Sequence, residues 1–168
     1  MKTEILNQNQ ISQKTERIAF EIYENFHNES QIFIAGIEGN GFIFAERLIQ
    51  KLNKISGDDF KDGIRLFSIK INKDNPLDDP IELSIDTNYL NGANIILVDD
   101  VINSGRTLIH AVSKLLENKV HNIKTAILVN RTHRRFPISA DFVGIDITTT
   151  LQDNIRVELK GKEVAYLV

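Results

Sequence analysis

The sequence contains no cysteine, so neither disulfide bonds nor thiolate metal sites can form in this chain. It also has no long apolar run near its start, because residues 1–10 (MKTEILNQNQ) lack the apolar core of a signal peptide or a membrane span. Positive charge is in slight deficit, with 20 Lys and Arg against 23 Asp and Glu and a formal net charge of -3. Such a charge provides no bulk attraction to nucleic acid. We expect a cytoplasmic protein that does not bind membranes.

The length and composition are those of an ordinary globular domain. The chain has 168 residues, 42% of them hydrophobic and 26% charged, which suits one domain with one core. We find no internal repeat, linker or low-complexity stretch in it. We therefore predict a single domain over residues 1–168.

Apolar patterning predicts helices alternating with buried strands. Apolar residues recur at helical spacing in residues 11–26, 44–52 and 108–116. Apolar or alternating runs predict strands at residues 31–35, 64–71, 94–98 and 123–129. The tail alternates over 154–159 and 161–168 and resembles a hairpin. This order predicts an α/β fold, with a mostly parallel central sheet flanked by helices and a small antiparallel end.

The clearest chemical signal follows the strand at 94–98. Two acids, a turn of small residues and a helix start come in this order: Asp99, Asp100, Asn103, Ser104, Gly105, Arg106 and Thr107. Ligands of open α/β sheets bind beyond the carboxyl ends of the strands. Backbone N–H groups of such a turn converge on an anion, and Arg106 and the two hydroxyls can add hydrogen bonds. The acids instead favour sugar hydroxyls or a divalent cation, so a sugar phosphate suits both halves. The alternative is that Asp100 or Asn103 only caps the helix.

The segment ILVDDVINSGRTL (residues 96–108) resembles the signature of type I phosphoribosyltransferases, which binds 5-phosphoribosyl 1-diphosphate (PRPP). ILNQNQISQKTERIAFEIYEN, GIEGNGFIFAERL, LVNRTHRRFPISADFVGIDI and NIRVEL resemble the bifunctional pyrimidine-operon attenuator and uracil phosphoribosyltransferase group. The resemblance implies a type I phosphoribosyltransferase fold with an antiparallel hood. It also implies that the protein transfers a phosphoribosyl group from PRPP to a uracil-like or purine base. The reaction would use Mg²⁺, and the protein would form a homodimer.

The same resemblance gives roles to the residues of the signature. Asp99 and Asp100 contact the ribose hydroxyls and are candidate Mg²⁺ ligands, unless the metal is held through PRPP alone. The turn from Asn103 to Thr107 surrounds the 5-phosphate. Asp99, Asp100 and Asn103 are the candidate catalytic residues. The segment at 72–91 has little periodicity, is typical of a mobile or disordered loop, and fits the flexible hood that closes over PRPP in this family.

Three positions depart from the family pattern. Asn130 lies where purine enzymes carry a base-reading lysine and the pyrimidine group usually carries aspartate, and an amide there does not discriminate between bases. Asn103 replaces an aspartate that acts on the base nitrogen in purine-salvage relatives, and an amide cannot serve as a general base. Glu38, Gly39 and Asn40 occupy the diphosphate loop, where relatives usually place a basic residue. The amides of this loop can still bind diphosphate; alternatively, the loop is only a tight connection with a solvated Glu38. A second hypothesis is therefore a non-catalytic PRPP or nucleotide sensor.

The remaining candidates concern the nucleobase and the diphosphate. We predict that Phe142 stacks on the base while the Val143 backbone reads its edge, although Phe142 also suits a core position. Arg131 is a candidate for the diphosphate and base; alternatively, the basic cluster around it is solvated. Lys70 or Lys73 is a candidate to reach the diphosphate. RNA is a possible partner by resemblance, but the acidic chain does not support it.

Overall fold

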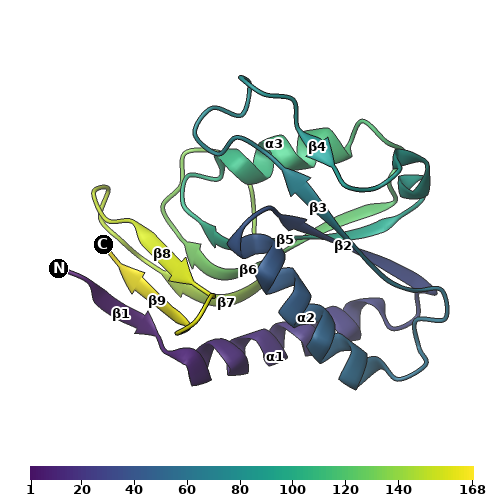
Figure 1. Cartoon of the computed structure of the whole chain (residues 1–168), viewed down its shortest axis with the longest axis horizontal. Helices are drawn as coiled ribbons and strands as arrows, with labels where there is room; N and C mark the ends of the chain where they lie inside the picture. The colour runs from purple at the N-terminus through teal and green to yellow at the C-terminus, as the bar shows by residue number, and fades with distance from the viewer.

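The computed structural model describes residues 1–168 as a six-stranded central sheet, helices on both of its faces, and a second sheet at one end (Figure 1). The central strands lie in the order β4-β3-β2-β5-β6-β7, and all neighbours except β3 and β4 are parallel. Their bounds are β2 Gln31–Ile37, β3 Gly63–Lys70, β4 Glu82–Leu83, β5 Asn94–Ile102, β6 Asn122–Arg131 and β7 Phe142–Ile147.

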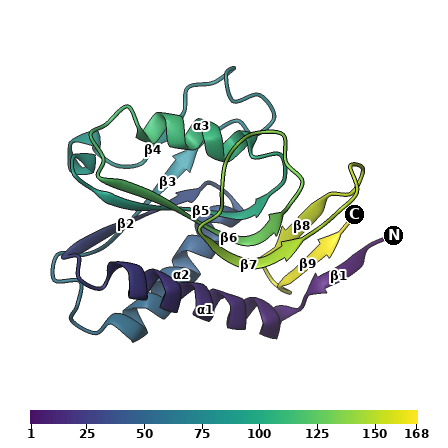
Figure 2. The same ribbon diagram turned by 180° about the vertical axis from the view of Figure 1, so that it is seen from behind.

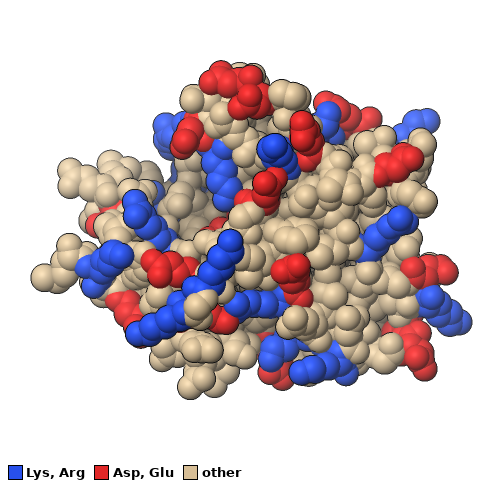
Figure 3. All heavy atoms as spheres, in the orientation of Figure 1, with Lys and Arg blue, Asp and Glu red and all other residues tan.

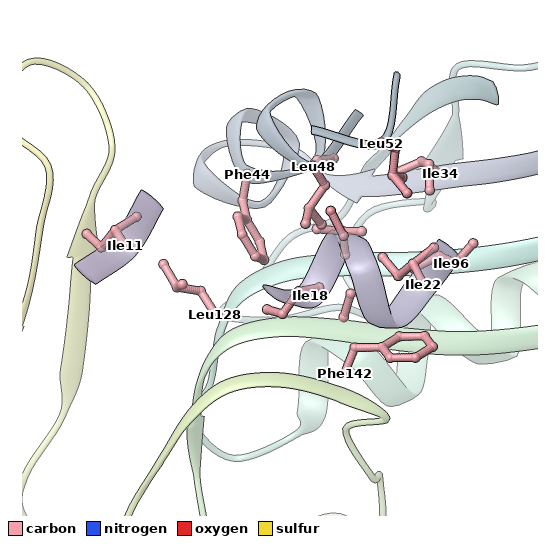
Figure 4. Close-up of a cluster of buried hydrophobic side chains, with 14 of the residues drawn as sticks. Ile11, Ile18, Ile22, Ile34, Phe44, Leu48, Leu52, Ile96, Leu128 and Phe142 are labelled. Atoms are coloured by element: carbon pink, nitrogen blue, oxygen red, sulfur yellow. The ribbon is translucent and has the colours of Figure 1, made fainter. Parts of the chain in front are cut away.

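Two helices, α1 (Gln8–Phe26) and α2 (Asn40–Ser56), cover one face of this sheet, and α3 (Arg106–Leu115) covers the other (Figures 1 and 2). The first helix begins with a capping box, in which the side chains of Asn7 and Gln10 each accept from the other residue's backbone N–H. Its apolar stripe packs with α2 and the sheet in a cluster that includes Ile18, Ile22 and Phe142 (Figure 4). A second buried cluster lies on the α3 side. The central sheet is therefore buried on both faces, as parallel sheets require.

The second sheet, which we call the hood, combines the two ends of the chain. Its strands are β1 (Thr3–Leu6), β9 (Val164–Leu167) and β8 (Ile155–Glu158), antiparallel and in this order. Figures 1 and 2 show both termini at this end of the molecule. Two side chains of α2 tie the hood to the central domain: Asn40 Nδ2 donates to the Val157 carbonyl at 2.7 Å, and Arg47 Nη2 to the Leu159 carbonyl at 2.7 Å.

The predicted α/β class, with its parallel sheet and antiparallel hood, is confirmed. Differences concern β1 and β7, which the patterning did not predict, and the length of β5, which continues through the acids to Ile102. The hood is formed by β1, β9 and β8, whereas residues 72–91 contribute β4 and a 3₁₀ turn, Thr87–Leu90, beside the central sheet. Residues 72–91 are therefore separate from the hood sheet, and that they close over PRPP stays a prediction. None of the helices combines the length and apolar character that crossing a membrane requires.

Candidate active site

A cleft of about 640 Å³ lies between the β5–α3 connection and the hood. Figure 3 shows a hollow on this face between the hood and the part that carries α3. Its lining comprises Asn40, Lys73, Asp74, residues 99–108, residues 155–158 and Tyr166. All seven signature residues from Asp99 to Thr107 that the sequence singled out are among them. The cleft is thus at the carboxyl end of β5, where ligands of open α/β sheets bind.

The two acids are the most deeply placed charges of this cleft. Asp99 is 3% exposed and Asp100 is 8% exposed. Asp99 Oδ1 accepts a hydrogen bond from the Asp100 backbone N–H at 2.9 Å and lies 3.7 Å from Lys73 Nζ. Burial and then the charge of Asp100 raise the pKa of Asp99 well above its ordinary value, and Lys73 only partly opposes them. The acids thus line the cleft, although β5 holds them within the strand and not after it.

Gly41, in the first turn of α2, allows the helix to approach this pair. A Cβ atom added at Gly41 would lie 2.7 Å from Asp99 Oδ1 and 3.2 Å from Asp99 Cα. Only glycine leaves room for the carboxylate at that distance. The packing of α2 against β5 therefore fixes where the Asp99 side chain lies.

The turn after β5 is open for an anion. The backbone N–H groups of Ser104, Gly105 and Thr107 donate to no acceptor in the protein, and that of Arg106 reaches only the Ser104 hydroxyl at 3.2 Å. Gly105 has a φ of 85° and caps the start of α3. The Ser104 carbonyl accepts from the N–H groups of Arg135 and Phe136, which anchors the turn from behind. Unpaired amides at a helix start are a binding site for phosphate.

Asn103 lines the cleft beside this turn. Its Oδ1 atom is buried and has no hydrogen-bond donor. Buried acceptors are almost always paired, and this oxygen has almost no solvent-accessible surface. Asn103 therefore borders the cleft without presenting Oδ1 to it.

The glycine loop at 38–40 contributes one residue to the cleft. Gly39, with a φ of 99°, precedes α2, and Asn40 lines the cleft while it bonds to the hood. Glu38 and Gly39 are exposed and do not line it. The structure brings Asn40 to the predicted site, but not the other two residues.

Phe142 and Val143, predicted to contact the base, do not line this cleft. Phe142 is 6% exposed and packs against α1 with Ile18 and Ile22 (Figure 4), which leaves it no open face for a base. The Val143 carbonyl accepts from Arg17 on α1 at 2.9 Å. Both residues lie on β7, whose buried side faces α1 and not the cleft. The alternative of a core role for Phe142 holds.

The side chain of Arg131 is also hydrogen-bonded within the protein. It is 7% exposed, its Nε donates to Thr149 Oγ1 at 2.5 Å, and its Nη2 donates to the Thr150 carbonyl at 2.6 Å. The residue does not line the cleft, because it lies at the end of β6, paired with Ile147 of β7, and its side chain reaches Thr149 and Thr150. Arg131 therefore anchors the chain that leads to the hood.

Of the two candidate lysines, only Lys73 lines the cleft. Arg106 holds the adjacent loop, because its Nη1 donates to the Asp74 carbonyl at 3.0 Å. The hood residues of the cleft, among them Arg156, Glu158 and Tyr166, were missed. The alternation of apolar and polar residues in the tail was visible in the sequence. The sequence did not show which face of these strands would lie over the signature turn.

No group of three or more His, Cys, Asp or Glu side chains is arranged to hold a metal ion. Mg²⁺ commonly binds through one or two carboxylates, waters and the phosphates of a substrate. The carboxylates of Asp99 and Asp100 suit that limited role, so the donor set fits a metal that arrives with a phosphorylated ligand.

Comparison with known proteins agrees with this site. The chain matches the model of the phosphoribosyl transferase domain family over residues 1–160. The protein named bifunctional protein PyrR of Fusobacterium nucleatum is 34% identical over 172 residues, covering 98% of this chain and 96% of that protein. Its namesake in Bacillus subtilis is 31% identical over 163 residues, covering 94% and 90%.

Solved structures agree in fold. A hypoxanthine-guanine phosphoribosyltransferase from Bacillus anthracis has a TM-score of 0.70 to this chain at 23% identity, covering 87% of this chain and 84% of that one. At this identity the similarity shows the fold alone. The family match spans the central sheet, the signature turn and β8, and the PyrR relatives align along nearly the whole chain. The chain therefore belongs to the phosphoribosyltransferase family of enzymes, and the PyrR proteins are among its relatives.

Proposed function

We propose that this cleft transfers the phosphoribosyl group of PRPP to a nucleobase and releases diphosphate. The observation that carries the proposal is the signature turn, whose unpaired amides lie beside two buried acids in one cleft. The amides of Ser104, Gly105 and Thr107 suit the 5-phosphate, and the carboxylates suit the ribose hydroxyls. A sugar phosphate is the ligand class that uses both.

The reaction breaks the bond between ribose C1 and the diphosphate, so positive charge develops on the sugar and negative charge on the leaving group. Mg²⁺ bound with PRPP supplies stabilisation of the diphosphate charge. The chain itself holds the 5-phosphate and the ribose so that C1 faces the incoming base. Negative charge on the Asp100 carboxylate favours the developing sugar cation.

The acceptor fits between the signature turn and the hood. A uracil-like or purine base has a ring N–H, and its proton is lost as the bond from that nitrogen to ribose C1 forms. Asn103 borders the cleft, but an amide is not a base at neutral pH, so the proton passes to the departing diphosphate or to water. Ile155, Val157 and Tyr166 provide the opposite wall.

A second candidate is a PRPP or nucleotide sensor without turnover. It is favoured by the loop at 38–40, which has an acid and no base where the family's diphosphate loop is expected, and the word bifunctional in the relatives' names is consistent with a regulatory role. RNA gains no support from the basic cluster, since Arg131 and Arg134 form internal hydrogen bonds. A homodimer is part of the proposal by family alone.

The test is release of diphosphate from Mg²⁺-PRPP with a panel of bases that includes uracil, hypoxanthine and guanine. We expect turnover with at least one base, and its loss in Asp100→Ala. Asp58→Ala, which removes an exposed acid outside the cleft, is the control and retains activity. If PRPP or a nucleotide raises the melting temperature but no base gives turnover, the sensor replaces the enzyme. If neither ligand has any effect, both candidates fail.

A further inference from the structure

The hood brings to the cleft a cation, the side chain of Arg156, that has no partner in the protein. Arg156 lies on β8, its side chain is exposed, and it lines the same cleft as the signature turn. The side chain takes part in none of the ion pairs of the chain. A guanidinium has five N–H donors in a planar fork that matches phosphate oxygens, so a free one facing an anion site is a candidate ligand.

The residue that would neutralise Arg156 is bound elsewhere. Glu158 lies two positions along β8 and so on the same face of the strand. Its carboxylate accepts a hydrogen bond from the Tyr166 hydroxyl. Tyr166, the cross-strand neighbour of Arg156 on β9, is further contacted by Lys2, whose Nζ lies 4.4 Å from the ring centroid. The hood face therefore leaves the Arg156 charge unpaired toward the cleft.

Of the other two cations of the cleft, Lys73 already has an acidic partner, and one donor of Arg106 is used by a backbone carbonyl. Lys73 Nζ lies 3.7 Å from Asp99 Oδ1, and Arg106 Nη1 donates to the Asp74 carbonyl at 3.0 Å. The lining also carries four acids, Asp74, Asp99, Asp100 and Glu158. Mg²⁺ that arrives with PRPP neutralises part of the diphosphate charge, and a further cation beside it would strengthen binding.

The position of β8 relative to the glycine loop favours the diphosphate end of PRPP over its 5-phosphate. The Asn40 side chain, at the end of that loop, donates to the Val157 carbonyl at 2.7 Å, which joins the loop to the residue after Arg156. This loop has Glu38 and no basic residue, so it can offer the leaving group amides but no positive side chain. The hood is held beside it by the same hydrogen bond.

We infer that Arg156 binds the diphosphate group of PRPP, so that the hood supplies the cation that the glycine loop lacks. The inference rests on the proposed function, because it assumes that PRPP occupies the cleft. It adds a binding residue outside the signature and outside the loop, and it makes diphosphate affinity dependent on the hood.

The experiment compares three ligands by titration calorimetry: Mg²⁺-PRPP, Mg²⁺-diphosphate and ribose 5-phosphate, which lacks the diphosphate. We expect Arg156→Gln to raise the dissociation constants of PRPP and diphosphate about ten-fold and to leave that of ribose 5-phosphate unchanged. Arg156→Lys should recover part of the affinity, because it keeps the charge but not the fork. Lys162→Gln, which removes an exposed hood cation outside the cleft, should bind all three ligands as the unsubstituted protein does.

Equal PRPP affinity in Arg156→Gln and the unsubstituted protein would overturn the inference while leaving the proposed function intact. An equal loss for ribose 5-phosphate would also overturn it, because the arginine would then act on the sugar phosphate or on the fold. If the unsubstituted protein does not bind PRPP, the proposed function fails first, before any variant is compared.

Discussion

Replacement of Gly105 by alanine tests the conformation of the phosphate turn. Gly105 has a φ of 85°, a left-handed conformation that costs an alanine about 1–2 kcal/mol. The added Cβ would also lie 2.6 Å from Ile138 Cγ2 and 3.2 Å from the Phe136 carbonyl oxygen. Forcing such contacts apart typically costs about 1–3 kcal/mol. We therefore expect Gly105→Ala to lower the free energy of unfolding by about 2–5 kcal/mol.

Gly92→Ala is the matched control. Gly92 has a φ of 72°, but an added Cβ would meet nothing within 4 Å. An alanine at this position therefore has the backbone cost of about 1–2 kcal/mol without the steric contact. Gly92 also precedes β5, at the end of that strand away from the cleft. Urea denaturation of both variants separates the backbone cost from the steric cost. Calorimetry with Mg²⁺-PRPP measures how each variant changes the affinity of the turn for its ligand. Affinity should fall in Gly105→Ala and be retained in Gly92→Ala. Equal stability losses with unchanged PRPP affinity in both would refute the reasoning.

Two further substitutions test charges near the cleft. Burial raises the pKa of Asp99 above its ordinary 3.8. The folded state therefore keeps this proton to a higher pH than the unfolded state does. As a result, the free energy of unfolding falls as the pH rises from 3.8 through the folded pKa. Asp99→Asn should therefore gain melting temperature relative to the unsubstituted protein between pH 4 and pH 7; a constant difference across that range would contradict this. Arg131→Ala should lower the free energy of unfolding by about 1.5–3 kcal/mol, because it removes the charge-assisted hydrogen bonds from a buried guanidinium to Thr149 and Thr150, without changing PRPP affinity. Weaker PRPP binding with unchanged stability would return Arg131 to the substrate site.

The signature side of the cleft could be predicted because it is local. Asp99 to Thr107 form one strand end, one turn and one helix start, so a contiguous stretch of sequence determines which amides converge. Residue types in that stretch also limit the ligand, since small residues suit phosphate and acids suit hydroxyls. The same locality explains why the helices and most strands of the central sheet were predicted.

The other wall could not be predicted because it depends on long-range packing. Arg156 reaches the cleft only because β8 pairs with β9, β9 pairs with β1, and Asn40 holds the hood in place. For Phe142, a strand residue of apolar type, the sequence does not determine which face α1 covers. The four-residue strand β1 has no partner near it in the sequence, since it pairs only with β9 at the other end of the chain.

The most direct test of the account is a crystal structure with a bound nucleoside 5′-monophosphate. We expect its 5′-phosphate within hydrogen-bond distance of the amides of Ser104, Gly105 and Thr107, and its ribose hydroxyls on the carboxylates of Asp99 and Asp100. A nucleotide bound with its phosphate elsewhere, or with its ribose turned away from the acids, would contradict the account.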